Sequence, residues 1–152
     1  MHYGYEDFRQ GQQIELGSAV VDREEMLAFA RRFDPQPFHL DDRAAAASVF
    51  GALSASGWFT CALWMRAYAD AVLADSTSLG SPGGNELRWT APVFPGDELA
   101  CSLTVNSTRI SASRPGMGLV EITGRAAVAA GDRAGQQVLQ FTFTGMFGTR
   151  TP

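Results

Sequence analysis

The sequence predicts an α+β fold in which a curved antiparallel sheet wraps around one buried helix. The first half of the chain has helix and loop signals, whereas the second half has long alternating strand patterns. Before the strands, the segment from Trp58 to Met65 is apolar on nearly every helical face, which is typical of a helix that is buried all round. Long antiparallel strands coil strongly, and this coiling favours wrapping around such a helix over a flat sheet.

The size and balance of the chain predict a single domain over residues 1–152. The 152 residues are 45% hydrophobic and 18% charged, an ordinary balance for a globular domain, and no internal repeat is present. A chain of this length buries about 70% of its unfolded surface. It can therefore form a core without disulfides or a structural metal.

An amphipathic helix is predicted between a short strand and a proline. Apolar residues alternate over about Ile14–Val21, as in a half-buried strand. Asp22 then offers an N-cap, and Glu25 completes a pair that resembles a capping box. An apolar stripe at helical spacing follows, formed by Met26, Phe29, Ala30 and Phe33. The helix must end near Phe33, because Pro35 disfavours the helical conformation in the residue before it.

The segment that leads to the central helix is predicted to be mostly loop. Residues 34–41 read DPQPFHLD, and their two prolines favour a constrained loop over a helix. A short helix is expected over Asp42–Phe50, followed by a loop at residues 51–57. Ser56 can cap the central helix, which is expected to continue to Val72.

The rest of the chain predicts a meander of antiparallel strands. Ser76–Gly84 has the composition of a flexible connector, and the run Glu86–Ala91 precedes a turn at Pro95–Asp97. Three alternating runs follow, with one apolar face made by Leu99, Cys101, Leu103 and Val105, then Val120, Ile122, Ala126 and Val128, then Leu139, Phe141, Phe143 and Phe147. Pairing with a second copy would protect the sheet edges, so we expect a homodimer.

Charge and composition exclude several classes of function. Sixteen acidic and twelve basic residues give a net charge of −4, which argues against nucleic acid or an anionic membrane as the main partner. All basic residues are arginine, so no Schiff-base or Walker-type lysine exists. Cys61 and Cys101 lie far apart in apolar surroundings, which favours buried thiols over a disulfide or a metal site.

The lack of a recognisable targeting signal in this sequence predicts a cytoplasmic protein. The N-terminal segment is polar and lacks the apolar region of a signal peptide. The most apolar stretch, Gly57–Leu73, is interrupted by Thr60, Arg66 and Asp70, and it is too short and polar to span a bilayer.

A proline-braced segment holds one carboxylate and one imidazole close in sequence. His39 follows Asp34 by five positions, with Pro35 and Pro37 between them. Regular secondary structure would point these two side chains apart, whereas a bend could bring them to face a common pocket. They could then share one water, as general acid–base catalysis requires. On this local evidence, a simple Asp-Pro turn and a structural histidine bonded to a nearby carbonyl remain the alternative.

The segment around this pair resembles the MaoC-like dehydratase family, which has the hot-dog fold and includes (R)-specific enoyl-CoA hydratases. The family motif is Asp, any residue, Asn, Pro, any residue and His, shortly followed by an acidic residue. Asp34, Pro37, His39 and Asp41 match it, while Gln36 replaces the Asn. The small-residue segment before the central helix and the later Pro-Gly-Asp turn are also similar, so the likeness extends over most of the chain.

The resemblance implies hydration of a trans-2-enoyl-CoA, or dehydration of the (R)-3-hydroxyacyl-CoA. Asp34, ionised at neutral pH, would orient and deprotonate the water. His39 would hold the same water and share the proton transfer, since imidazoles titrate near neutral pH. The partner would be an acyl-CoA or acyl-carrier-protein thioester, and neither a metal nor another cofactor is expected.

The start of the central helix would stabilise the enolate oxygen. The backbone N–H groups of Gly57 and Trp58 are expected to be free there, at the positive end of the helix dipole, with Ser56 beside them. One such donor contributes about 3–4 kcal/mol to transition-state stabilisation. Glycine at position 57 would let a thioester carbonyl approach closely, although a glycine that provides only loop flexibility is the alternative.

Two departures from the family pattern keep two other functions open. Ser56 stands where many of the family's hydratases have a His, and Met65 stands where some have a Ser. A hot-dog thioesterase is one alternative, but it commonly needs a carboxylate from the central helix, and Asp70 is the only acid well inside that helix. A non-catalytic subunit that binds acyl groups is the other.

Further side chains receive weaker assignments. Residues at helical spacing are more often core than pocket, so we expect core positions for Trp58, Phe59, Trp64 and Met65 rather than the lining of an acyl tunnel. Arg43 and Arg88 are candidates for the phosphates of coenzyme A, with a solvated surface charge as the alternative for each.

Overall fold

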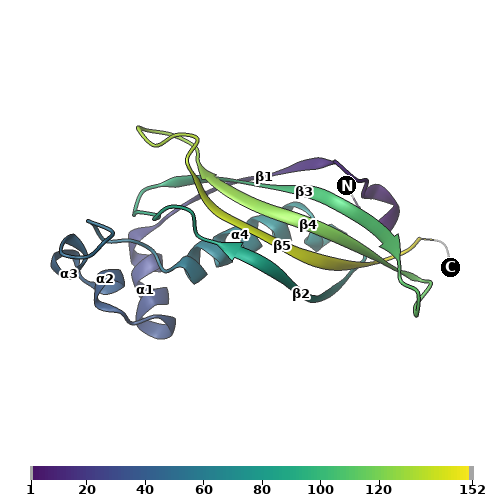
Figure 1. The fold of residues 1–152 in the computed structure, drawn as a ribbon, viewed down its shortest axis with the longest axis horizontal. Helices are drawn as coiled ribbons and strands as arrows, with labels where there is room; N and C mark the ends of the chain where they lie inside the picture. The colour runs from purple at the N-terminus through teal and green to yellow at the C-terminus, as the bar shows by residue number, and fades with distance from the viewer. Residues whose placement is uncertain (1, 151–152) are drawn as a thin grey trace.

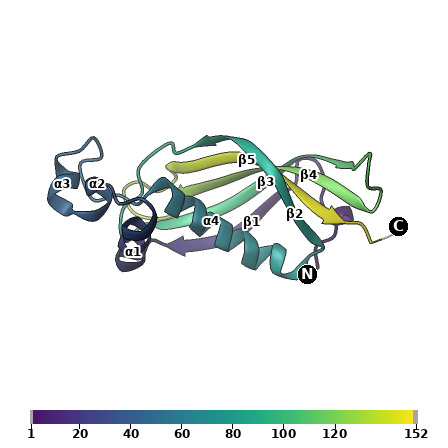
Figure 2. The same cartoon turned by 90° about the horizontal axis from the view of Figure 1, so that it is seen from below.

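The computed structural model describes residues 2–150 as a sheet that curves around a helix (Figure 1). The sheet has five strands in the order β1-β3-β4-β5-β2, and all neighbours are antiparallel. The strands are β1 (Gln13–Val20), β2 (Ser78–Arg88), β3 (Glu98–Ile110), β4 (Met117–Val128) and β5 (Gln137–Gly148). Helix α4 (Gly57–Ala71) runs lengthwise along one face, as Figure 2 shows. This arrangement confirms the predicted α+β class.

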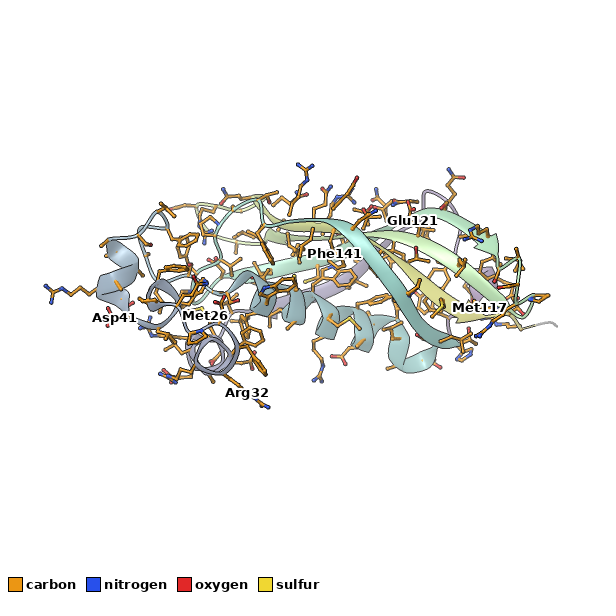
Figure 3. The ribbon with its side chains drawn as sticks, turned by 60° about the horizontal axis from the view of Figure 1, so that its bottom comes forward. Met26, Arg32, Asp41, Met117, Glu121 and Phe141 are labelled. Carbon is orange, nitrogen blue, oxygen red and sulfur yellow. The ribbon has the colours of Figure 1, made fainter. Side chains whose placement is uncertain are left out.

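The other helices gather at one end of the sheet (Figure 1). They are α1 (Arg23–Phe33), α2 (Pro37–Leu40) and α3 (Asp42–Ala46), and the 3-10 turns η1 (Tyr5–Asp7) and η2 (Leu73–Asp75) lie elsewhere. The Asp22 side chain caps α1 by accepting a 2.8 Å hydrogen bond from the Glu25 N–H, and the helix ends at Phe33, as predicted. In Figure 3, Met26 and Asp41 mark this helical end and Met117 marks the opposite end.

Three predicted elements are wrong in detail. The segment expected to be all loop contains the single turn α2, because Pro37 at its first position tolerates a helical start. The next helix ends at Ala46 instead of Phe50. The expected connector Ser76–Gly84 belongs largely to β2, which begins at Ser78 and pairs with β5 through several register shifts. Backbone pairing with β5 thus overrides the local turn signals, and the glycines absorb the irregularities.

The core lies between α4 and the concave face of the sheet. Trp64 is 1% exposed, stacks edge-on against Phe141 at 4.7 Å, and donates a 3.1 Å hydrogen bond from its indole to the Ser102 carbonyl. Gly124 on β4 makes room for this indole, since a Cβ there would lie 2.6 Å from Trp64 Cζ2. The alternating apolar faces of β3 and β4 form the other half of this core.

The prediction that α4 is buried on every face is wrong for the single chain. Trp58 is 56% exposed and Met65 is 48% exposed, because the sheet covers only one side of the helix. Phe59 and Trp64 are buried as expected. None of the helices within residues 2–150 combines the length and the apolar character needed to cross a bilayer.

Candidate active site

A bend between α1 and α2 brings Asp34 and His39 together. Asp34 ends α1, where its N–H donates to the Ala30 carbonyl at 2.9 Å. Pro37 then starts α2, and this single turn carries His39 back toward the helix end. As a result, His39 Nε2 lies 3.4 Å from Asp34 Oδ2. The two side chains face each other, which the spacing alone left open.

The tautomer of His39 follows from its buried neighbour. His39 is 6% exposed, and its Nδ1 lies 2.8 Å from the Ser54 carbonyl oxygen. A carbonyl oxygen can only accept a hydrogen bond, so Nδ1 carries the hydrogen. In the neutral ring, the lone pair of Nε2 therefore points to the side of Asp34.

Asp34 is held in its ionised form by its neighbours. Burial is the largest single influence and raises the pKa, but hydrogen bonds from Gln36 and Ser56 and the charge of His39 together hold the pKa of Asp34 below its ordinary value. The Gln36 amide donates to Asp34 Oδ1 at 2.6 Å. The amide at position 36 thus braces the carboxylate, which leaves Oδ2 directed at His39.

These groups lie in the wall of a cavity of about 530 Å³, which we call the catalytic cavity. Asp34 and His39 form one side, and Gly57, Trp58 and Trp89 at the start of α4 and the end of β2 form another. The cavity thus combines an ionised carboxylate, an imidazole and a helix N-terminus, which are the kinds of group that proton transfer next to a carbonyl needs.

Only one of the two predicted helix amides is free. The Ser56 side chain caps α4 and accepts the Trp58 N–H at 3.3 Å, so that amide already has a partner. The Ser56 carbonyl accepts from Phe59 and Thr60. No acceptor within residues 2–150 is hydrogen-bonded to the Gly57 N–H. The free donor at this helix start is therefore Gly57, while Ser56 braces both the helix and Asp34.

Trp89, which the sequence reading missed, fills the space beside Gly57. Its indole Nε1 donates a 2.9 Å hydrogen bond to the Gly57 carbonyl. A Cβ at position 57 would lie only 2.3 Å from Trp89 Cε2, so the ring lies against the glycine Cα. The indole gives a reason for glycine here that the sequence did not show, while the close approach of a thioester carbonyl stays a prediction. Thirty-one residues separate the two in sequence, and no motif links them.

The segment between β2 and β3, which also lines the catalytic cavity, is held in place by long-range hydrogen bonds. The Ala55 N–H donates to the Val93 carbonyl at 2.8 Å, and the Thr90 hydroxyl donates to the Gln137 carbonyl at 2.6 Å. Arg133 reaches from the β4–β5 turn to Asp97, with N···O distances of 2.5 Å. The residues after β2 are thereby fixed against α4 and β5.

A second cavity of about 500 Å³, which we call the apolar cavity, lies between α4 and the strands β2 and β5. Its lining is mostly apolar and includes Trp58, Trp64, Met65, Tyr68, Phe143 and Phe147. The expectation of core positions is therefore wrong for Trp58 and Met65, which line this cavity and are exposed, while Trp64 lines it and is still buried in the core. Burial raises the pKa of Tyr68 strongly, so its phenol stays neutral here.

The remaining candidates lie away from the catalytic cavity. Arg43 and Arg88 are exposed and are not among the residues that line it. Asp70 is exposed and pairs with Arg66 one turn earlier on α4, with N···O 2.7 Å. Cys61 and Cys101 are both free thiols, and burial raises the pKa of Cys101 to about 11. No cluster of three or more metal-ligating side chains occurs within residues 2–150.

Comparisons with known proteins show what the whole chain is similar to. Residues 7–125 match the family model described as MaoC like domain. A MaoC-like dehydratase of Rhodospirillum rubrum, known from its crystal structure, is 36% identical, with a TM-score of 0.86 over 98% of this chain and 99% of that chain. A curated (R)-specific enoyl-CoA hydratase of the same organism is 28% identical over 109 residues, which cover 69% of this chain and 70% of the relative.

The fold name comes from a more distant structure. A conserved hypothetical protein of Mycobacterium tuberculosis, described as having a double hotdog fold, superposes with a TM-score of 0.77. The match covers 99% of this chain and 45% of that chain at 18% identity, so it speaks for the fold alone. The predicted resemblance to the family and the predicted hot-dog fold are confirmed.

Proposed function

Since the chain belongs to the MaoC-like domain family, we propose that it hydrates trans-2-enoyl thioesters to (R)-3-hydroxyacyl thioesters, or catalyses the reverse dehydration. The observation that carries this proposal is that Asp34 and His39 face each other in the cavity that Gly57, with its free N–H, also lines. The similarity to an (R)-specific enoyl-CoA hydratase supports it. The substrate class is an acyl thioester of coenzyme A or an acyl carrier protein.

The geometry favours one bound water between the two side chains. In its neutral form, with hydrogen on Nδ1, His39 presents an acceptor at Nε2, and ionised Asp34 presents a second acceptor 3.4 Å away. Two acceptors this close repel each other unless a molecule with two O–H groups donates to both. Such a water would have its lone pairs free to face the substrate, which is the orientation that attack on the β-carbon needs.

The reaction then balances with proton transfers alone. Asp34 takes a proton from the water as the oxygen bonds to Cβ, and the electrons of the double bond move toward the thioester oxygen. The Gly57 N–H stabilises the resulting enolate oxygen, at the positive end of α4. The proton passes through the Asp34–His39 pair to Cα on the same face, which gives syn addition. No step requires a metal or a redox cofactor.

The decisive test is hydration of crotonyl-CoA, followed as the loss of enoyl absorbance. Asp34→Asn keeps the shape of the side chain but removes the base, so we expect turnover to fall by about 10²–10⁴-fold. Thermal unfolding of the variant should stay close to wild type. Undiminished hydration by the variant would overturn the assignment of the base. Release of free thiol from acyl-CoA without hydration would identify a thioesterase instead, and tight binding without turnover would identify a non-catalytic subunit.

We also propose that two copies pair along β2. Every residue of this edge strand is exposed in the single chain. Five large apolar side chains are exposed around it, namely Trp58, Met65, Leu79, Leu87 and Trp89. An exposed apolar edge of this kind is protected when another strand covers it. The mass in solution, measured by light scattering, should be that of a dimer, and Leu87→Asp should shift it toward the monomer. A wild-type monomer would contradict this proposal.

The cytoplasmic location stays a prediction.

A further inference from the structure

The catalytic cavity and the apolar cavity adjoin at one side chain. Trp58 lines both, whereas Asp34, His39 and Trp89 line only the first, and Met65, Tyr68 and Leu87 line only the second. The two spaces have similar volumes, about 530 Å³ and about 500 Å³. Together they would form one continuous channel along α4, with its polar groups at the helix start and its aromatic groups further along.

Trp89 forms the fixed half of the division between them. Its indole hydrogen-bonds the Gly57 carbonyl at 2.9 Å and lies against the Gly57 Cα. The next residue, Thr90, is bonded to the Val138 carbonyl through its N–H and to the Gln137 carbonyl through its hydroxyl. The Trp89 ring therefore cannot swing aside without breaking its own hydrogen bond and losing its contact with Gly57.

Trp58 forms the other half. Its ring stands edge-on to Trp89, with a centroid distance of 5.0 Å and an interplanar angle of 83°. It is 56% exposed in the single chain, where the pairing along β2 proposed above would cover it, and no hydrogen bond of its indole occurs within the described residues. Removal of this one side chain would join the two cavities and leave the backbone of α4 in place.

We propose that Trp58, braced against Trp89, closes the catalytic cavity toward the apolar cavity and limits the substrate to thioesters with short acyl tails. This inference rests on the hydratase function proposed above and names the substrate class for that site. An acyl chain that extends from the thioester along α4 meets the Trp58 ring after the first few carbons. Beyond that ring, the apolar lining has the chemistry to hold further methylenes, but the chain cannot reach it.

The dependence of affinity on chain length distinguishes a closed from an open division. Each methylene that enters an apolar cavity improves affinity by about fourfold, whereas a methylene that stays in water contributes nothing. In the wild type, affinity should therefore rise over the first carbons and then stay flat. In Trp58→Ala it should continue to rise, because the tail can enter the apolar cavity.

The experiment measures the dissociation constants of saturated acyl-CoAs of four to twelve carbons by calorimetry, on the purified protein in its solution assembly. Trp58→Ala leaves the backbone N–H of residue 58 in place, and Trp58→Leu is the second variant if the alanine protein does not fold. Phe33→Ala is the matched control, since Phe33 is an aromatic side chain that is 61% exposed on α1 and lines neither cavity. We expect twelve-carbon binding to improve at least tenfold in the Trp58 variant and to stay at the wild-type level in the control.

Two results would overturn this inference. One is a wild-type affinity that already climbs with every added carbon, and the other is a Trp58 variant that stays as flat as the wild type. Because saturated acyl-CoAs cannot be hydrated, these measurements do not depend on turnover. A protein that shows the expected chain-length behaviour but does not hydrate crotonyl-CoA would contradict the proposed function and leave the division by Trp58 intact.

Discussion

The catalytic cavity has two walls of different origin. The Asp34–His39 wall takes both of its ionisable groups from residues close in sequence, with the short bond from Gln36 to Asp34 between them and a brace from Ser54 and Ser56 before α4. The Gly57–Trp89 wall is built from distant residues, and packing holds it, because the indole lies where a Cβ would be. The first wall supplies the ionisable groups and the second supplies the shape. Substitutions in the first should therefore change the chemistry, whereas substitutions in the second should change stability first.

The largest further effect is expected at His39. His39→Ala removes one of the two acceptors for the water, so turnover should fall by about 10²-fold or more. It also leaves the Ser54 carbonyl without its donor in a buried place, which costs about 1–3 kcal/mol of unfolding free energy. Steady-state hydration and urea unfolding of the same preparation check both parts. Full turnover in this variant would mean that the reaction depends on the Asp34 carboxylate alone.

Gly57→Ala should show the opposite balance. The added methyl group would meet the Trp89 ring, and overpacking of this kind costs about 1–3 kcal/mol of unfolding free energy. Trp89→Ala in the same chain should remove most of that cost, since the space beside residue 57 is then empty. A double-mutant cycle on urea unfolding measures this coupling. Equal destabilisation by the methyl group in both backgrounds would show that the indole is not the reason for the glycine.

Trp89→Phe should give a smaller effect in the same wall. The ring contact remains, but the hydrogen bond to the Gly57 carbonyl is lost, at a cost of about 0.5–1.5 kcal/mol. We expect kcat to fall a fewfold with little change in KM, since the Gly57 amide loses part of its support. A rise in KM with unchanged kcat would assign Trp89 to substrate binding instead.

The smallest effect concerns pH and the bond between the neighbours Gln36 and Asp34. The folded-state pKa of Asp34 lies below the ordinary value of 3.8, so this carboxylate stabilises the fold above that pH and loses its contribution as the pH falls through the folded-state pKa. Gln36→Leu removes one of the hydrogen bonds that lower the pKa, so both acid unfolding and the acid limb of kcat/KM should move to higher pH. Unfolding and activity measured from pH 3 to 7 check this; superimposable profiles would contradict it.

Local signals in the sequence were sufficient to predict those elements that depend on contacts between residues close together in the chain. The Asp22 cap, the end of α1 at Phe33 and the start of α4 after Ser56 all follow from side-chain hydrogen bonds or proline sterics within a few residues. The alternating faces of β3 and β4 follow from the period of a strand. Together with the matched family motif, these signals predicted the class of fold and the segment that carries the carboxylate and the imidazole.

The tertiary structure decided everything that depends on contacts between distant segments. The connector that became β2, the exposed face of α4, and the indole of Trp89 beside Gly57 all result from pairing or packing across tens of residues. Sequence periodicity indicates which side of a helix or strand is apolar. It does not indicate which other element covers that side. For this reason the shape of the cavity could be described only from the tertiary structure.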